Sequence, residues 1–361
     1  MAAYVDGAGR YLGQVGNESS SSMLNASPIP SVVKYHRALG RELLDVGILR
    51  DTILPSLQVH GSLALVAYGV ARATDGVEGK DWLWPVAPVV NGWWSAVGRK
   101  VFVRGLTLPQ AFATLSRPER LLLAGVSLWG GRLFYRIATR SARRRRAQPG
   151  SDDARYEEAK KDPGFWNKAL LTLFVPEALV QTVISLPFTA PFHHQGAVLT
   201  GYHPVIQAVA VGIFSAGFAL EVLADKQLEE FKQDPKNKNA VCKEGVWSLV
   251  RHPNYLGDSL VHFSFPLLLY GSDMLAPIEI LGCLANYLFL RYVGGDKQTE
   301  QHQERRYSQT NLEKHADFVK FKETHNSVWP RVEVVGNKWL WYVLGAGAAG
   351  AAIEQAIHQL L

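Results

Sequence analysis

The sequence predicts an all-α fold: a polytopic transmembrane helix bundle of about seven to eight spans, with polar loops on its cytosolic side. Apolar runs close to the bilayer-spanning length of about 20 residues recur through the 361-residue chain. Trp and Tyr gather at the ends of runs, as at Trp82, Trp84 and Trp93, where interfacial aromatic belts form. An Arg-rich segment at 136–162 lies between two runs, as a cytoplasmic loop does.

The apolar runs divide the chain into its expected spans. Buried helices of a large soluble protein would give similar runs. Several runs, however, contain Pro and Gly, which membrane helices tolerate, and we therefore favour membrane spans. In chain order the runs cover 52–71, 82–98, 120–138, 169–188, 205–224, 259–272, 275–293 and 338–361.

The polar segments between the runs set the expected topology. If 136–162 is cytoplasmic, then 225–258 is cytoplasmic two spans later, and a short pair of spans returns 294–337 to the same side. This assignment places the basic residues of 99–120 on the lumenal side, against the positive-inside rule.

Four regions follow from this pattern. Residues 1–45 are rich in Gly, Ser and Asn, show no signal-peptide pattern, and are expected to form a disordered tail. The tail contains Asn-x-Ser sequons at Asn17 and Asn25, which suit a lumenal location. The other regions are an N-terminal transmembrane half at 46–200, a C-terminal half at 201–335 and an extra transmembrane helix at 336–361.

Several classes of site are disfavoured by the residues present. The net charge of +6 is concentrated in the Arg-rich segment, so a cytoplasmic loop is favoured over a nucleic-acid-binding tail. Cys242 and Cys283 are too few for a disulfide framework or a cysteine zinc site, and no H-E-x-x-H or G-x-S-x-G motif occurs. "GAGAAG" at 345–350 fits a dinucleotide fingerprint by letter, but it lies in an apolar helix, where close helix packing explains it. No metal site and no nucleic-acid partner are expected.

One polar stretch stands directly before an apolar run. "VCKEGVWSLVRHPNYLGDSL" at 241–260 contains Arg251, and Pro253 favours a helix that begins at or just after it. Asn254, Asp258 and His262 then share one face of that helix. A carboxylate and an imidazole on a membrane helix are costly unless they face a cavity or a partner, so this face is a candidate site.

Two further stretches carry polar helix faces. Glu221, Asp225 and Lys232 share a face in "FALEVLADKQLEEFKQDPKNK", and Glu300 and Tyr307 share one within 294–330. If the three stretches converge on one cytosolic mouth, they offer Arg and Lys for phosphates and Asn, Asp and Tyr for amide or ribose groups. NADPH and S-adenosylmethionine are the ligands that these groups suit.

The same stretches resemble a known group of proteins. "ALEVLADKQLEEFK", "GVWSLVRHPNYLGDSL" and the Glu-rich "TEQHQERRY" resemble the C-terminal half of the steroid 5-alpha-reductase/sterol-reductase superfamily. The closest branch is its membrane family of unknown function, which "DWLWP", "SLWGGRLFYRIATR" and "DARYEEAKKD" also resemble. The resemblance covers roughly residues 50–330 and leaves out the tail and the last span.

The resemblance implies a multi-pass enzyme of the endoplasmic reticulum membrane that reduces a carbon–carbon double bond with NADPH. The proton donors of the superfamily come from the N-terminal half. There, Asp81 and Tyr135 are the candidate catalytic residues, and Trp129 and Arg132 are further candidates for the proton donor. Carried over by position, the cofactor-binding residues are Asp225, Lys232, Arg251, His252, Asn254, Tyr255, Asp258 and Tyr307.

The leading hypothesis is thus an NADPH-dependent reductase of a sterol-like or other lipid enone, with substrate in the N-terminal half and cofactor in the loops of the C-terminal half. Its partners would be the lipid bilayer and a hydrophobic small molecule. The main alternative is a membrane methyltransferase of the isoprenylcysteine or phospholipid type, which uses a similar R-H-P-x-Y turn to bind S-adenosylmethionine. A third is a non-catalytic membrane scaffold that kept the fold.

Overall fold

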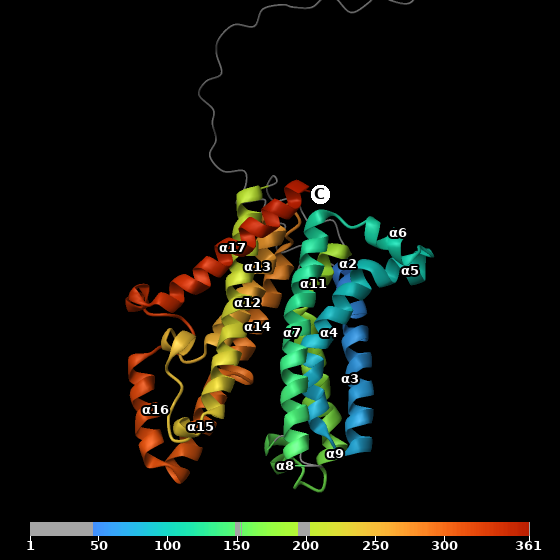
Figure 1. The fold of residues 1–361 in the computed structure, drawn as a ribbon. Coiled ribbons are helices and arrows are strands. Elements are labelled where there is room, and N and C mark those ends of the chain that lie inside the picture. The colour runs from blue at the N-terminus through green and yellow to red at the C-terminus, as the bar shows by residue number, and fades with distance from the viewer. Residues whose placement is uncertain (1–45, 149–151, 153, 194–202, 361) are drawn as a thin grey trace, which may run out of the picture. The chain divides into compact units, whose positions relative to one another are not determined.

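The computed structural model describes residues 46–148, 152, 154–193 and 203–360, all of which belong to one unit, Glu42–Leu361. Every regular element in these ranges is a helix, so the predicted all-α class is confirmed (Figure 1). The predicted disordered tail at 1–45, with its two sequons, lies outside the described residues.

Four helices build the N-terminal part: α3 (Leu54–Thr74), α4 (Leu83–Trp93), α7 (Arg117–Ala147) and α10 (Val175–Ile184). Helix α4 packs on α7 and α3, and α10 packs on α3. The approach of α4 to α7 depends on Gly130, where a Cβ atom would stand 2.7 Å from the carbonyl oxygen of Pro85. The short helices are α2 (Val46–Ile48), α5 (Arg99–Arg104), α6 (Leu108–Ala113), α8 (Ala154–Ala159), α9 (Phe165–Ala169) and α11 (Leu186–Thr189).

The C-terminal part is centred on α12 (Pro204–Gln233) and α13 (Pro253–Gly271), which lie side by side. Two glycines allow this contact, because a Cβ on Gly217 would lie 2.7 Å from the carbonyl oxygen of Gly257, and a Cβ on Gly257 would lie 2.6 Å from that of Gly217. Close helix approach through small residues is typical of membrane bundles. The other helices of this part are α14 (Ile280–Leu288), α15 (Asp296–Thr310), α16 (Leu312–Thr324) and α17 (Lys338–Leu360).

The "GAGAAG" segment lies inside α17, as the helix-packing interpretation requires. Its Gly347 faces α12, where an added Cβ would stand 2.7 Å from the carbonyl oxygen of Gly212 and 3.1 Å from the Cβ of Ala216. The segment therefore serves contact between two helices and has no strand before it.

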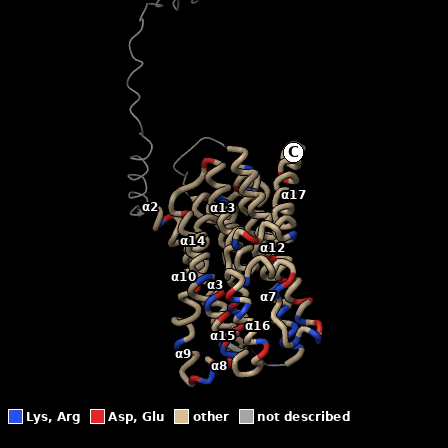
Figure 2. The backbone as a smooth tube through the Cα atoms, turned by 90° about the vertical axis from the view of Figure 1, so that its left-hand side faces the viewer, with Lys and Arg blue, Asp and Glu red and all other residues tan. Residues whose placement is uncertain are grey.

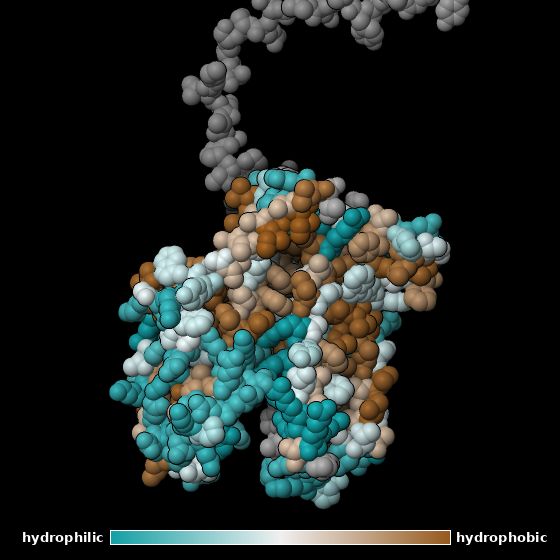
Figure 3. All heavy atoms as spheres, in the orientation of Figure 1, coloured by the Kyte–Doolittle hydropathy of each residue, from teal (hydrophilic) through white to brown (hydrophobic). Residues whose placement is uncertain are grey.

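Charged residues gather at one end of the bundle, which we call the polar end: it carries α8, α9, α15 and α16 together with the C-terminal ends of α7 and α12 (Figures 1 and 2). Apolar side chains cover most of the opposite half in the face shown in Figure 3. This separation of apolar and charged surface is expected of a helical protein partly embedded in a bilayer.

Two helical stretches are long and apolar enough to cross a membrane, Leu49–Thr74 and Pro204–Gln233. The pair Phe165–Ile184 and Leu186–Phe192 would be a third if its 58° bend is counted within one span. Other predicted runs form shorter α-helices, such as α4 with eleven residues and α14 with nine. The structure thus supports two or three candidate spans in the described part of the chain.

Candidate functional site

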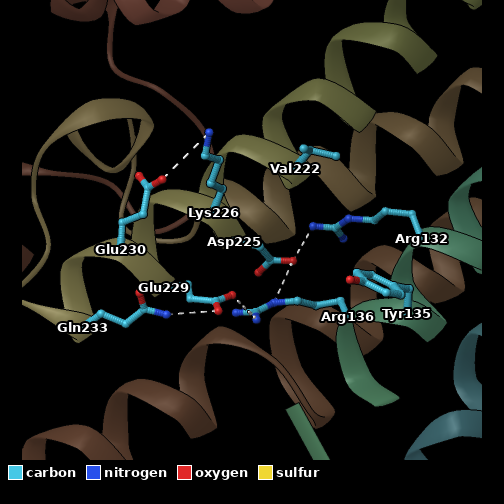
Figure 4. A pocket seen from close by; sticks show the side chains of 9 residues that line it. All are labelled: Arg132, Tyr135, Arg136, Val222, Asp225, Lys226, Glu229, Glu230 and Gln233. Carbon is cyan, nitrogen blue, oxygen red and sulfur yellow. Dashed lines mark hydrogen bonds and ion pairs between the residues drawn. The ribbon is translucent and has the colours of Figure 1, made fainter. Parts of the chain in front are cut away.

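A pocket of about 430 Å³ lies between α7 and α12 near the polar end. Figure 3 shows a cleft edged by hydrophilic residues in the region that Figure 1 assigns to these two helices. The pocket is lined by two predicted site residues, Tyr135 and Asp225, and by other charged groups of both helices (Figure 4). The full lining is Arg132, Tyr135, Arg136, Val222, Asp225, Lys226, Glu229, Glu230 and Gln233.

A ladder of ion pairs runs along this pocket from the bundle interior towards the polar end. Arg132 begins it: one guanidinium nitrogen donates to Oε2 of Glu221 at 2.8 Å, and another donates to the backbone carbonyl of Glu221 at 2.8 Å and to Asp225. Arg136 then bridges Asp225 at 3.4 Å and Glu229 at 3.1 Å. The spacing of the acids on α12, at four residues each, matches one face of a helix.

Asp258 lies at the inner end of the site, buried with 7% of its surface exposed. Its carboxylate accepts hydrogen bonds from Nδ2 of Asn286 at 2.7 Å and from Nε1 of Trp129 at 3.3 Å, and it lies 3.0 Å from Nδ1 of His262. Asp258 and His262, which were predicted to share a helix face, are thus in direct contact. Three helices, α7, α13 and α14, hold this carboxylate in place.

Arg251 and His252 meet on Glu300 of α15. Arg251 forms a two-point pair with Glu300, with nitrogen–oxygen distances of 2.9 and 3.0 Å, and Nε2 of His252 lies 2.8 Å from the same carboxylate. The remaining guanidinium nitrogen of Arg251 donates to the carbonyl oxygens of Lys322 and His325. The structure therefore brings the 241–260 and 294–330 stretches together.

Burial by itself raises the pKa of Glu300, but the hydrogen bonds from His252 and Arg251 outweigh it and lower the pKa to about 2. Burial lowers the pKa of His252, and its bond to Glu300 opposes that shift only in part. Tyr255 stacks on the His252 ring with centroids 5.2 Å apart. Glu300 is consequently an ionised acceptor that fixes the turn before α13.

A basic cluster lies at the polar end, defined here as Arg136, Arg140, Lys232, Arg306 and Lys314. Lys232 is close enough to Arg136, Arg140 and Arg306 to interact with their charges. Burial and then the charge of Arg306 lower the pKa of Lys314. The ring of Tyr307 lies between two of these cations, with the Arg306 Cζ and the Lys314 Nζ each 5.1 Å from its centroid. Four helices, α7, α12, α15 and α16, thus bring like charges together, which favours an anionic ligand.

Three further predicted residues, Asp81, Tyr135 and Asn254, take no part in the ion-pair ladder or the basic cluster. Asp81 accepts a hydrogen bond from the Tyr156 hydroxyl and lies 3.9 Å from the Lys80 ammonium, and it does not line the pocket. Tyr135 lines the pocket with 70% of its surface exposed. Asn254 has a buried Oδ1 atom without a hydrogen-bond partner.

Sequence reasoning missed three contributors: Asn286, Arg306 and Lys314. Asn286 is a lone amide in the apolar run 275–293, and that isolation was the available signal. The approach of Arg306 and Lys314 to the cluster depends on where α15 and α16 lie, which no local pattern shows. Within the described ranges, no group of three or more His, Cys, Asp or Glu side chains is arranged to hold a metal ion.

Comparison with known proteins gives one match. The model of a family described as "Protein of unknown function (DUF1295)" matches residues 67–322, which is more than half of the chain. No curated protein and no solved structure matches. The predicted resemblance to a family of unknown function is confirmed in this respect, while the wider reductase superfamily remains a prediction. The chain belongs to the DUF1295 family of proteins of unknown function.

Proposed function

We propose that this protein is a membrane-embedded, NADPH-dependent reductase of a carbon–carbon double bond in a sterol-like or other lipid enone. In this proposal it is a multi-pass protein of the endoplasmic reticulum, with about seven to eight spans and its polar end in the cytosol. The observation that supports the proposal most is the basic cluster, which lies at the outer end of the same ion-pair ladder that leads towards Asp258.

The basic cluster suits the phosphates of the cofactor. Lys232, Arg306 and Lys314 offer cationic donors from three helices, and Arg pairs with phosphate through two parallel hydrogen bonds. The guanidinium of Arg251 is already bonded to Glu300 and to two carbonyls. In the proposal, therefore, Arg251 holds the turn that presents Asn254, and the basic cluster takes the phosphates.

The side chain of Asn254 has a feature that fits a nicotinamide. Its Oδ1 atom is buried and accepts no hydrogen bond, and a buried acceptor without a partner is costly. A carboxamide N–H group is a fitting donor to this atom. The cofactor would supply the hydride, and the residues of the chain would bind it, orient it and keep water away from the double bond.

The substrate end of the proposal follows from the position of the site. Asp258 and its partners Trp129 and Asn286 are buried within the helices rather than exposed at the polar end. A buried polar group among apolar helices suits a lipid that carries a conjugated carbonyl. A donor that polarises this carbonyl would stabilise the developing enolate.

Charge separates the proposal from its main alternative. S-adenosylmethionine is a sulfonium cation without phosphate groups, so the basic cluster does not favour it, even with Arg136 paired to Asp225 and Glu229. NADPH, in contrast, carries several negative charges. The third possibility, a non-catalytic scaffold, predicts that neither ligand binds.

Thermal unfolding of the full chain in detergent distinguishes the three. NADPH should raise the melting temperature, because a ligand that binds only the folded state stabilises it by mass action. S-adenosylmethionine should leave the melting temperature unchanged. Stabilisation by S-adenosylmethionine alone would identify the methyltransferase alternative. An unchanged melting temperature with both ligands would favour the non-catalytic scaffold.

A further inference from the structure

His262 is the most deeply buried ionisable group of the site, with 1% of its surface exposed. Its ring lies among aromatic side chains, with centroids 4.7 Å from Trp129 and 6.0 Å from Phe188. Its Nδ1 atom is 3.0 Å from both the backbone oxygen and Oδ1 of Asp258, and its Nε2 atom is buried without a hydrogen-bond partner. In this imidazole, Nδ1 is therefore engaged by Asp258, whereas Nε2 has no hydrogen-bond partner.

The contact with Asp258 decides which nitrogen can change its protonation. Two acceptor oxygens face Nδ1, so the neutral ring carries its hydrogen there and leaves the lone pair on Nε2. A proton that arrives at Nε2 produces an imidazolium, which the carboxylate of Asp258 stabilises. Asn286 and Trp129 donate to the same carboxylate and keep it ionised and oriented.

Glu221 connects this pair to the pocket. Its Oε2 atom accepts from Arg132, its Oε1 atom is buried without a partner, and its carboxyl lies close enough to that of Asp258 to interact electrostatically. The glycine contact between α12 and α13 brings them together, since the Cγ of Glu221 lies 2.8 Å from where a Cβ on Gly257 would stand. Arg132 also contacts Asp225, which lines the pocket.

The balance of charge in this group is unusual for a buried site. Glu221, Asp225, Glu229 and Asp258 are four carboxyls, against the three guanidiniums of Arg132, Arg136 and Arg143. Buried charges are stable only when they are paired, so one additional proton would neutralise the group. Among the other elements packed on α13, α14 contributes the neutral Asn286 and α11 the apolar Phe188, so neither supplies that charge.

We infer that Glu221, Asp258 and His262 form a buried site for one exchangeable proton, which Arg132 joins to the pocket by its ion pairs with Glu221 and Asp225. Proton exchange at this site involves no oxidation or reduction. A proton bound on Nε2 of His262 leaves as H⁺ and is replaced by a proton from water at the pocket. Its use rests on the proposed function. There, the hydride of NADPH forms the new C–H bond at the β-carbon, the electron pair of the double bond moves to the α-carbon, and this proton completes the second C–H bond.

Difference titration of the full-length protein in detergent tests the site without any cofactor. Proton uptake is compared for wild type and His262→Gln between about pH 5 and pH 8, where histidine titrates. Wild type should bind one proton more than the variant. Glu221→Gln, which keeps the shape and His262 but removes one negative charge, should lower the midpoint by about one pH unit, a tenfold loss of proton affinity. The matched control is Glu323→Gln, an exposed acid on α16, which should not move it.

Each outcome decides the inference. Equal proton uptake by wild type and His262→Gln overturns it, and so does an unchanged midpoint in Glu221→Gln. If His262→Gln fails to fold, the comparison of wild type with Glu221→Gln still applies, since both retain His262. NADPH binding to wild type is measured separately. Its absence together with the expected titration would retain the proton site and reject the reductase.

Discussion

The Arg251 guanidinium and the Glu300 carboxylate form a two-point ion pair that joins the turn before α13 to α15, with nitrogen–oxygen distances of 2.9 and 3.0 Å. The backbone strengthens the junction, because the amide of Arg251 donates to the carbonyl of Asn326 and the amide of His252 donates to that of Ser327. The pair therefore fixes where α13 begins and where Asn254 and Asp258 are presented.

Breaking the pair should destabilise the protein. Glu300→Gln leaves the Arg251 charge with the carbonyl oxygens of Lys322 and His325 but without its carboxylate. We expect a loss of about 2 to 3 kcal/mol, slightly below the range for fully buried pairs because each side chain is 11% exposed. Chemical unfolding in detergent measures it. Arg305→Ala removes an exposed charge of α15 and is the control, expected to change stability by less than about 0.5 kcal/mol. Equal effects of the two substitutions would show that the pair is not important for stability.

The same pair predicts a pH dependence. The folded-state pKa of Glu300 is about 2, below its ordinary 4.5, so the unfolded chain binds protons first as the pH falls. The stabilisation is present above pH 4.5 and is lost between 4.5 and 2. The lowered pKa of His252 acts in the same direction below 6.5. Melting temperature measured from about pH 6 to pH 3 should fall more steeply for wild type than for Glu300→Gln. Parallel curves would contradict this assignment.

The contact of α12 with α13 should be intolerant of side chains. In Gly257→Ala the new Cβ would stand 2.6 Å from the Gly217 carbonyl oxygen and 2.8 Å from the Cγ of Glu221, so the helices must separate. We expect a loss of about 1 to 3 kcal/mol, seen as a lower melting temperature. Gly69→Ala on α3 is the matched control, since nothing lies within 4 Å of its added Cβ. If both variants melt alike, close approach at Gly257 is not required.

Local patterns predicted the helices and the polar faces well. The all-α class follows from the apolar runs, and the contact of Asp258 with His262 follows from helix geometry, because both lie within a few residues of each other. The small-residue interpretation of 345–350 is also confirmed, because α17 packs on α12 there.

Features that depend on tertiary contacts could not be predicted in the same way. The resemblance places Arg251 among the cofactor-binding residues, and its pairing with Glu300 could not be predicted because the two residues are far apart in the chain. The contribution of Asn286 depends on α14 lying beside α13. The number of spans is also hard to read from hydropathy, since the run 275–293 is as apolar as a span, yet its α-helix α14 has only nine residues.

The central claim is that the basic cluster binds the phosphates of NADPH, and equilibrium titration of purified wild type and Lys314→Ala with NADPH tests it most directly. The account predicts that wild type binds NADPH more tightly than NADH, because only NADPH carries the additional phosphate. It also predicts that Lys314→Ala weakens NADPH binding about tenfold and that Arg305→Ala does not. Absence of NADPH binding, or equal affinity of wild type and Lys314→Ala for NADPH, would contradict it.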